Sequence, residues 1–157
     1  MGKVAIHARD DVDMAEFKNI YNAHEHGAND PVRIDRYASF IFWFDPSGQL
    51  NEDPGTSYVA RTTAEQKPVV LTDIAEARVV VTAEGNEADS GKGIEIYNST
   101  DAVQLCEVTW DGTSRQDGLA GSWTAVAISG EKTLIPRYKG STATEDLTTY
   151  WVELQVR

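Results

Sequence analysis

Oxygen ligands suited to a hard cation gather in one short stretch of the chain. Glu84, Asn86, Glu87 and Asp89 fall within six residues. Calcium takes roughly six to eight oxygen ligands of this kind, so the stretch is a calcium candidate. Its spacing does not match an EF-hand loop, because no Glu closes the set. An acidic loop without a bound ion is therefore the favoured interpretation.

Two other groups have metal-binding side chains. His24-Glu25-His26 places two histidines at i and i+2, but a zinc site needs a third protein ligand and no cysteine pair is present. Histidines at the end of a helix, where they complement its dipole, are the simpler interpretation. Asp111 and Asp117 are a weaker calcium pair in a second polar stretch.

Motifs for catalysis are absent from the sequence. It contains no G-x-S-x-G, no G-x-G-x-x-G and no G-x-x-x-x-G-K-[ST]. The three histidines all lie in the first 26 residues, far in sequence from a serine nucleophile on the strands. Paired carboxylates for glycoside chemistry stay open, because no spacing selects a pair. We therefore predict a protein that is not an enzyme, with no catalytic residue and no cofactor.

Aromatic side chains are the better candidates for a binding surface. Trp123 and Trp151 are out of phase with the apolar positions of their segments, and such residues could stack on sugar rings or pack against a neighbouring subunit. Tyr138 is a third candidate. The alternative is that these side chains are covered because both faces of their strands are buried.

Charge and composition narrow the partners. The net charge is −11, from 25 acidic and 14 basic residues, and it repels the phosphate backbone of nucleic acids. No apolar run reaches the roughly 18 residues of a membrane span, and the start of the chain lacks the pattern of a secretory signal. We expect a location in the cytoplasm or in a virus particle. The single cysteine, Cys106, is expected to be a buried thiol.

Short alternating segments dominate the chain after residue 36. In the last segment, Tyr150, Val152, Leu154 and Val156 share one face, which is the period of a half-buried strand. The first segment, Tyr37–Phe44, is apolar on both faces, as in a strand that is covered on both sides. We expect eight or nine strands, drawn from the segments Tyr37–Phe44, Thr56–Thr62, Pro68–Thr72, Glu76–Ala83, Gly93–Asn98, Val103–Trp110, Ser122–Ile128, Thr133–Lys139 and Thr148–Arg157.

Turns and one helix complete the predicted order. Asp45–Gly48 is predicted to be a turn, and 111–121 a long polar loop. Pro136 should lie at a sheet edge or a bulge. Residues 1–36 are predicted to form an arm and a short amphipathic helix, and 37–157 a single antiparallel β-sandwich of the jelly-roll or Greek-key type.

The C-terminal segments GKGIEIYNSTDAVQLCEVTW, SWTAVAISGEKTLIPRYKG and LTTYWVELQVR resemble the strand succession of small jelly-roll modules. Two groups share this pattern: structural proteins of phage and archaeal virus particles, and carbohydrate-binding modules. The resemblance covers about 65 residues and is one of pattern, so it assigns no role to any residue.

The virion group fits the sequence better. A lone domain without a signal or a catalytic module would meet its partners inside a cell, and the arm could reach a neighbouring subunit. We therefore predict a self-associating coat, decoration or tail protein that contacts other structural proteins. Closed symmetry is usual for homo-oligomers, and we expect a trimer ahead of a dimer. The alternative is a carbohydrate-binding module, with calcium as a candidate stabilising ion.

Overall fold

The computed structural model describes residues 32–34, 39–61, 65–71, 74–126 and 128–157. The predicted arm and helix, with the His24-Glu25-His26 group, lie outside these residues except for 32–34. Ten strands are present: β1 (Val32–Ile34), β2 (Ser39–Asn51), β3 (Lys67–Leu71), β4 (Glu76–Gly85), β5 (Ser90–Asn98), β6 (Val103–Asp111), β7 (Gln116–Ala120), β8 (Thr124–Ala125), β9 (Gly130–Lys139) and β10 (Leu147–Val156).

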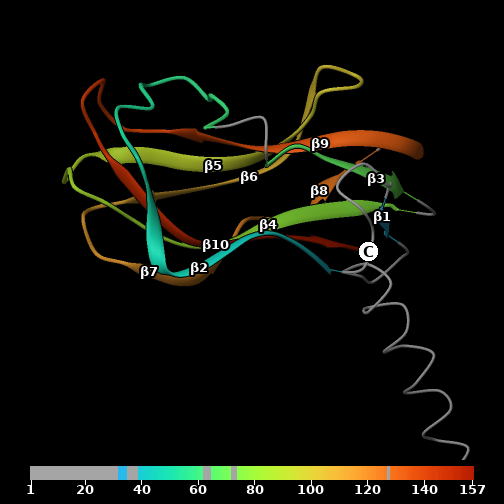
Figure 1. The fold of residues 1–157 in the computed structure, drawn as a ribbon, viewed down its shortest axis with the longest axis horizontal. Coiled ribbons are helices and arrows are strands. Elements are labelled where there is room, and N and C mark those ends of the chain that lie inside the picture. The colour runs from blue at the N-terminus through green and yellow to red at the C-terminus, as the bar shows by residue number, and fades with distance from the viewer. Residues whose placement is uncertain (1–31, 35–38, 62–64, 72–73, 127) are drawn as a thin grey trace, which may run out of the picture.

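The strands form two sheets that face each other. Sheet A has the order β1-β3-β9-β5-β6, and sheet B has the order β2-β10-β4-β7, with β8 also paired to β4. All pairs are antiparallel except β1 with β3. Figure 1 shows β5, β6 and β9 in one layer and β2, β4, β7 and β10 in the other. The predicted antiparallel β-sandwich is confirmed at this level.

Alternating side chains build the core between the sheets. On β4, Ala77, Val79 and Val81 point inward and are fully buried, and Val152 and Leu154 of β10 lie beside them. Sheet A supplies residues of the same kind from β5, β6 and β9 to the same cluster. Burying each such aliphatic side chain stabilises the fold by about 1.5–3 kcal/mol. Period-two alternation thus decides which side chains face the core, and the alternate side chains lie on the outer faces of the sheets.

The first predicted strand is wrong in two respects. It does not end at a turn, because β2 continues through 45–48 to Asn51 beside the same neighbour, β10. Phe44 pairs with Trp151 and Gln49 pairs with Thr149, so the four residues 45–48 of β2 lie opposite a single residue of β10. Gly48, with a φ of 76°, allows the bend in this bulge. It is also not covered on both sides, since Phe44 is largely exposed.

Three other segments differ from the prediction. The described part of Thr56–Thr62 forms only a single bridge, between Val59 and Tyr138. The predicted loop 111–121 contains β7, whose backbone pairs with Val80, Val81 and Ala83 of β4. In the described part of 122–128, the strand is limited to β8, which shares one edge of β4 with β7, and the Val126 amide donates to the Ala75 carbonyl.

Of two predictions for single residues, that of a sheet edge or bulge at Pro136 is wrong. β9 lies between β3 and β5, and its register with β5 is unbroken at Pro136. β3 ends its pairing with β9 at Leu134, and the Tyr138 amide points to Val59, so Pro136, which has the same phase, lacks its N–H on the side away from β5. The other prediction, for Cys106, is confirmed. Cys106 is buried in the core, and burial raises the pKa of its thiol. Among the described residues, no helix is long and apolar enough to cross a membrane.

Candidate functional site

The calcium candidates do not converge. Glu84 accepts a hydrogen bond from the Tyr150 hydroxyl at 2.7 Å. The Asn86 side-chain oxygen accepts a hydrogen bond from the Asp146 backbone amide at 2.9 Å, which holds Asn86 against the loop before β10. In the part of the chain that the structure describes, no three His, Cys, Asp or Glu side chains are grouped as metal ligands. The structure therefore does not assemble these oxygens around one point.

A buried lysine holds this end of the sandwich. Lys92 Nζ lies 2.5 Å from the backbone oxygen of Asp89 and 3.2 Å from Glu145 Oε1, and both side chains of the ion pair are fully buried. Burial would raise the pKa of the Glu145 carboxyl, but hydrogen bonds from Ser141 and from Lys92 outweigh it and lower the pKa. The loop before β5 is thus neutralised by Lys92, and the buried Lys92–Glu145 ion pair is not accessible to a ligand.

Tyr138 is not available as a binding residue. Its side chain is fully buried, its hydroxyl donates to Glu65 at 2.9 Å, and its ring lies under the guanidinium of Arg61, 4.8 Å from the ring centroid. Arg61 also lies over Trp43 at 4.9 Å and forms an ion pair with Glu65. Burial, and then the Glu65 charge, raise the pKa of Tyr138. The prediction of Tyr138 as an interface residue is corrected: it joins the two sheets from inside.

Trp123 lies outside the core cluster, and cations cover it. The guanidinium of Arg78 is 4.6 Å from its ring centroid and that of Arg157 is 4.4 Å away. Arg78 is held in turn by Gln155 at 2.9 Å, and Arg157 by Glu76 at 2.6 Å. Both arginines restrict access to the indole, so Trp123 is a poor platform for a flat ligand.

Trp151 belongs to an open apolar surface on the outer face of sheet B. Its ring meets that of Phe44 edge to face, with centroids 5.3 Å apart. Phe44 is 62% exposed, Leu50 48% and Ile41 37%, and all three project from β2 on the same side as Trp151. We call Ile41, Phe44, Leu50 and Trp151 the Phe44 patch. Sequence reasoning identified Trp151 and missed the other three. The double apolar pattern of Tyr37–Phe44 suggested that Ile41 and Phe44 were buried, and Leu50 lay outside the predicted strand.

The outer face of sheet A has the opposite character. Glu95 and Glu107 lie directly opposite each other on β5 and β6. Glu95 is only 1% exposed and forms an ion pair with Arg137, and Tyr58 donates to Glu107 at 2.8 Å. Burial raises the pKa of Glu95, and Arg137 offsets part of the rise.

Catalysis by these two carboxylates is disfavoured. A glycoside mechanism requires an acid and a base that both reach the sugar. Glu95 is sealed beneath Arg137 and the loop that carries Tyr58, so a substrate has no path to it. Gly93 lets this loop approach, since a Cβ there would lie 2.5 Å from the Tyr58 hydroxyl. The cluster fastens the loop after β2 onto sheet A, above β5 and β9 in Figure 1.

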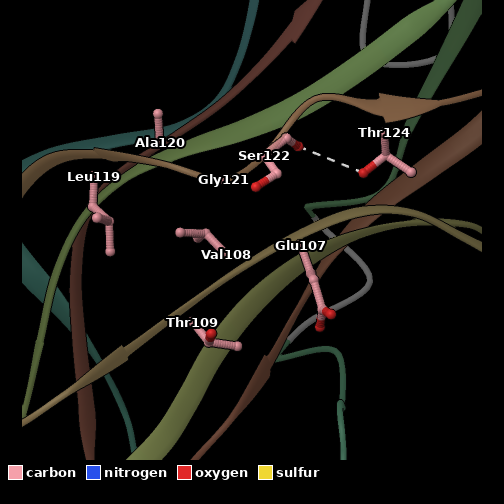
Figure 2. A pocket seen from close by; sticks show the side chains of 8 residues that line it. All are labelled: Glu107, Val108, Thr109, Leu119, Ala120, Gly121, Ser122 and Thr124. Atoms are coloured by element: carbon pink, nitrogen blue, oxygen red, sulfur yellow. Dashed lines mark hydrogen bonds between the residues drawn. The ribbon is translucent and has the colours of Figure 1, made fainter.

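A groove of about 350 Å³ separates β6 from the segment that joins β7 to β8. Figure 2 shows the residues that line it, which are Glu107, Val108 and Thr109 of β6 and, from the other side, 119–122 and Thr124. The groove contains one carboxylate, hydroxyl groups and no positively charged or imidazole side chain. These groups do not amount to a catalytic or metal-binding set.

Comparisons with known proteins do not assign a family. No family model matches the chain, and no curated protein matches it. One similar solved structure is a carbohydrate-binding module, CBM36, in complex with calcium and xylotriose. Its TM-score is 0.43 at 10% sequence identity, and the match covers 69% of this chain and 99% of that one.

Proposed function

We propose that this chain is a non-enzymatic structural protein that binds other protein chains through the Phe44 patch. The observation that carries the proposal is the exposure of Phe44. It is the most exposed large hydrophobic side chain of the described residues, and Ile41 and Leu50 are exposed on the same face of β2. Exposed apolar side chains that gather on one face of a domain mark interaction sites.

The shape of the patch favours a protein over a glycan. Two of its four members are aliphatic, and the two aromatic rings meet edge to face instead of forming a flat platform. The other candidate for sugar stacking, Trp123, is covered by Arg78 and Arg157. Aromatic residues such as Phe44 and Trp151 are enriched at the centre of protein interfaces.

The sandwich is proposed to be of the jelly-roll type. The support is the strand order, since β2-β10-β4-β7 in one sheet faces β3-β9-β5-β6 in the other. Successive strands from β2 to β5 alternate between the sheets, and β9 and β10 each insert between two earlier strands. This is the winding of eight strands into two Greek keys. A role in a virus particle is part of the proposal, and it rests on the resemblance of the C-terminal segments.

Site-specific photo-crosslinking tests the proposed function. A benzophenone-bearing phenylalanine replaces Phe44, and a matched chain carries it at Val103, which is 43% exposed on β6. Both chains are irradiated in the cells that produce them. We expect protein crosslinks at position 44 and few at position 103. Equal crosslinking at both positions, or none, would refute the proposal.

Carbohydrate binding is the second candidate. Trp151 lies beside polar side chains, since its indole N–H donates to Glu153 at 3.1 Å and Gln155 donates to the same carboxylate at 3.2 Å. An aromatic ring next to a carboxylate and an amide is suited to a sugar. Retention on polysaccharide gels that Trp151→Ala abolishes in a folded chain would favour this function over the first.

A further inference from the structure

Loop 52–61 is held on sheet A with little buried surface. Backbone hydrogen bonds of 2.7–2.9 Å tie it to Tyr138 of β9 and to Gly140. Within 56–60, the Tyr58 side chain is half-buried and the others are exposed. Segments with few buried apolar contacts open locally at a lower free energy than the whole fold. We therefore expect the loop to leave sheet A while the sandwich stays folded.

The Tyr58 side chain crosses the outer face of sheet A from β9 to β6. Its ring centroid lies 4.6 Å from Lys139 Nζ of β9, and its hydroxyl donates to Glu107 of β6 at 2.8 Å. β5 runs between these strands, and Gly93 leaves space for the hydroxyl, since a Cβ there would lie 2.5 Å from it. Glu95, the next outward residue of β5, is buried and lies directly opposite Glu107. Tyr58 is thus part of the cover that keeps water from Glu95.

Two carboxylates and two cations lie together where Tyr58 crosses the sheet. Among the described residues, the titratable groups of this cluster come from β5, β6, β9 and the loop: Glu95, Tyr97, Glu107, Arg137, Lys139 and Tyr58. Glu95 forms an ion pair with Arg137 on one side and has Glu107 directly opposite on the other, and like charges in that position are destabilising. Burial raises the pKa of Glu95, and Arg137 offsets part of the rise. The closed loop therefore favours the protonated form of Glu95.

We propose that loop 52–61 is a pH-sensitive strap, which is held closed while Glu95 is protonated and opens more often when Glu95 is ionised. Opening removes Tyr58 and lets water reach the Glu95 carboxylate, which lowers the cost of its charge. Closure and protonation therefore favour each other. The contribution of Glu95 to closure is full below its usual pKa of 4.5 and is lost as the pH rises through the higher pKa of the closed state.

Glu107 acts in the opposite direction. An ionised carboxylate accepts the Tyr58 hydrogen bond more strongly than a neutral one does. Glu107 is exposed, however, so water competes for this bond, whereas Glu95 is buried. The buried carboxyl therefore sets the net direction, and a rise in pH opens the loop.

Amide hydrogen exchange of the full chain, followed by NMR, tests the proposal. The Val59 and Gly140 amides donate across the contact between the loop and the end of β9. Their protection factors, from which the intrinsic effect of pH on exchange is divided out, therefore report opening of the loop. We expect both amides to be less protected than those of the β4–β10 ladder at every pH. Between about pH 4 and about pH 7 their protection should fall by about fivefold or more.

Three variants identify the titrating group. Glu95→Gln removes it and keeps the size of the side chain, so the pH dependence at Val59 should disappear. Glu131→Gln, an exposed change on β9 of the same sheet, is the matched control and should leave the dependence unchanged. Tyr58→Phe keeps Glu95 but removes the bond to Glu107, so it should lower the protection of Val59 by about fivefold at each pH and retain the dependence. Thermal unfolding shows that each variant is folded.

Protection that is constant or rises with pH in the natural chain would overturn the proposal, as would the same dependence after Glu95→Gln. Equal protection of Val59 and the β4–β10 ladder would also overturn it, because the loop would then open only when the whole chain unfolds. If Glu95→Gln does not fold, Tyr58→Phe decides. Unchanged protection of Val59 in that variant would mean that Tyr58 does not hold the loop closed, and the proposal would fall.

Discussion

The two outer faces of the sandwich show opposite ways to treat a sheet surface. The outer face of sheet A is closed by its own chain: Glu95 is buried against Arg137, and Tyr58 spans the strands to Glu107. The outer face of sheet B leaves Phe44, Ile41 and Leu50 in solvent. The polar groups on the outer face of sheet A have hydrogen-bond and ion-pair partners within the chain. The apolar groups on the outer face of sheet B are exposed among the described residues.

This difference indicates where function lies. Buried ionisable groups require partners, because an unpaired buried charge is costly. Sheet A meets that requirement internally, so its charged cluster serves stability even though it has the residue types of a catalytic site. Exposed apolar groups are not stabilised by contacts within the sheet, and covering them with another surface lowers the free energy.

Among the residues of the two outer faces, the largest expected effect is on the closed face. Replacing Arg137 by Met leaves the Glu95 carboxylate buried without its cation, and we expect a loss of about 3 kcal/mol in the free energy of unfolding. Denaturant unfolding followed by tryptophan fluorescence measures it. The double variant Glu95→Gln/Arg137→Met is the control, and it should recover much of the loss. A loss below about 0.5 kcal/mol for the single variant would show that the cluster does not stabilise sheet A.

Tyr58→Phe should have a smaller effect on the same face. It removes one hydrogen bond to the Glu107 carboxylate, which is exposed to water, so we expect a loss of about 1 kcal/mol. Loop 52–61 should then become more sensitive to limited proteolysis, because the hydroxyl group is one of its ties to sheet A. Unchanged proteolysis would mean that the other contacts of the loop, among them the Val59 bridge to Tyr138 and the hydrogen bond from the Gly140 amide to the Gly55 carbonyl, are sufficient to hold it.

The pH dependence of stability separates two buried carboxyls. The raised pKa of Glu95 means that the folded state binds its proton more tightly than the unfolded state, so its contribution is full below the usual pKa of 4.5 and is lost as the pH rises through the folded value. Glu145, with a lowered pKa, behaves in the opposite way: its contribution is lost as the pH falls through the folded value. Unfolding at several pH values, compared with Glu95→Gln, isolates the first effect. The advantage of the natural chain over this variant should grow as the pH falls, and a constant difference would contradict the assignment.

Period-two alternation explains why much of the fold was predictable. The inward residues of β4, β5, β6 and β10 follow it, and the hairpin between β5 and β6 was expected from it. Segments that pair mainly through backbone groups were missed or misjudged, as at β7 and Val59. Backbone hydrogen bonding does not require an alternating pattern of side chains, so these elements cannot be predicted without knowing which strands lie beside them.

The candidate site was predicted in part. Phase placed Trp151 off the core, and the structure agrees. Tyr138 has an equally polar-aromatic character, but it faces inward on β9 because its phase matches Leu134. The apolar run of β2 could not distinguish a central strand that is covered on both faces from an edge strand with exposed outward residues. Only the strand order reveals that β2 is an edge.

The smallest expected change in stability is at the patch itself, and it is the sharpest test of the comparison. Phe44 is mostly in solvent, so Phe44→Ser should alter the free energy of unfolding of the monomer by no more than about 0.5 kcal/mol. Phe42, two residues earlier on the same strand, is 6% exposed, and Phe42→Ser should cost about 3 kcal/mol or more. Denaturant unfolding at low protein concentration compares the two. Similar losses would mean that Phe44 is packed within its own chain, and the outer face of sheet B would then be as closed as that of sheet A.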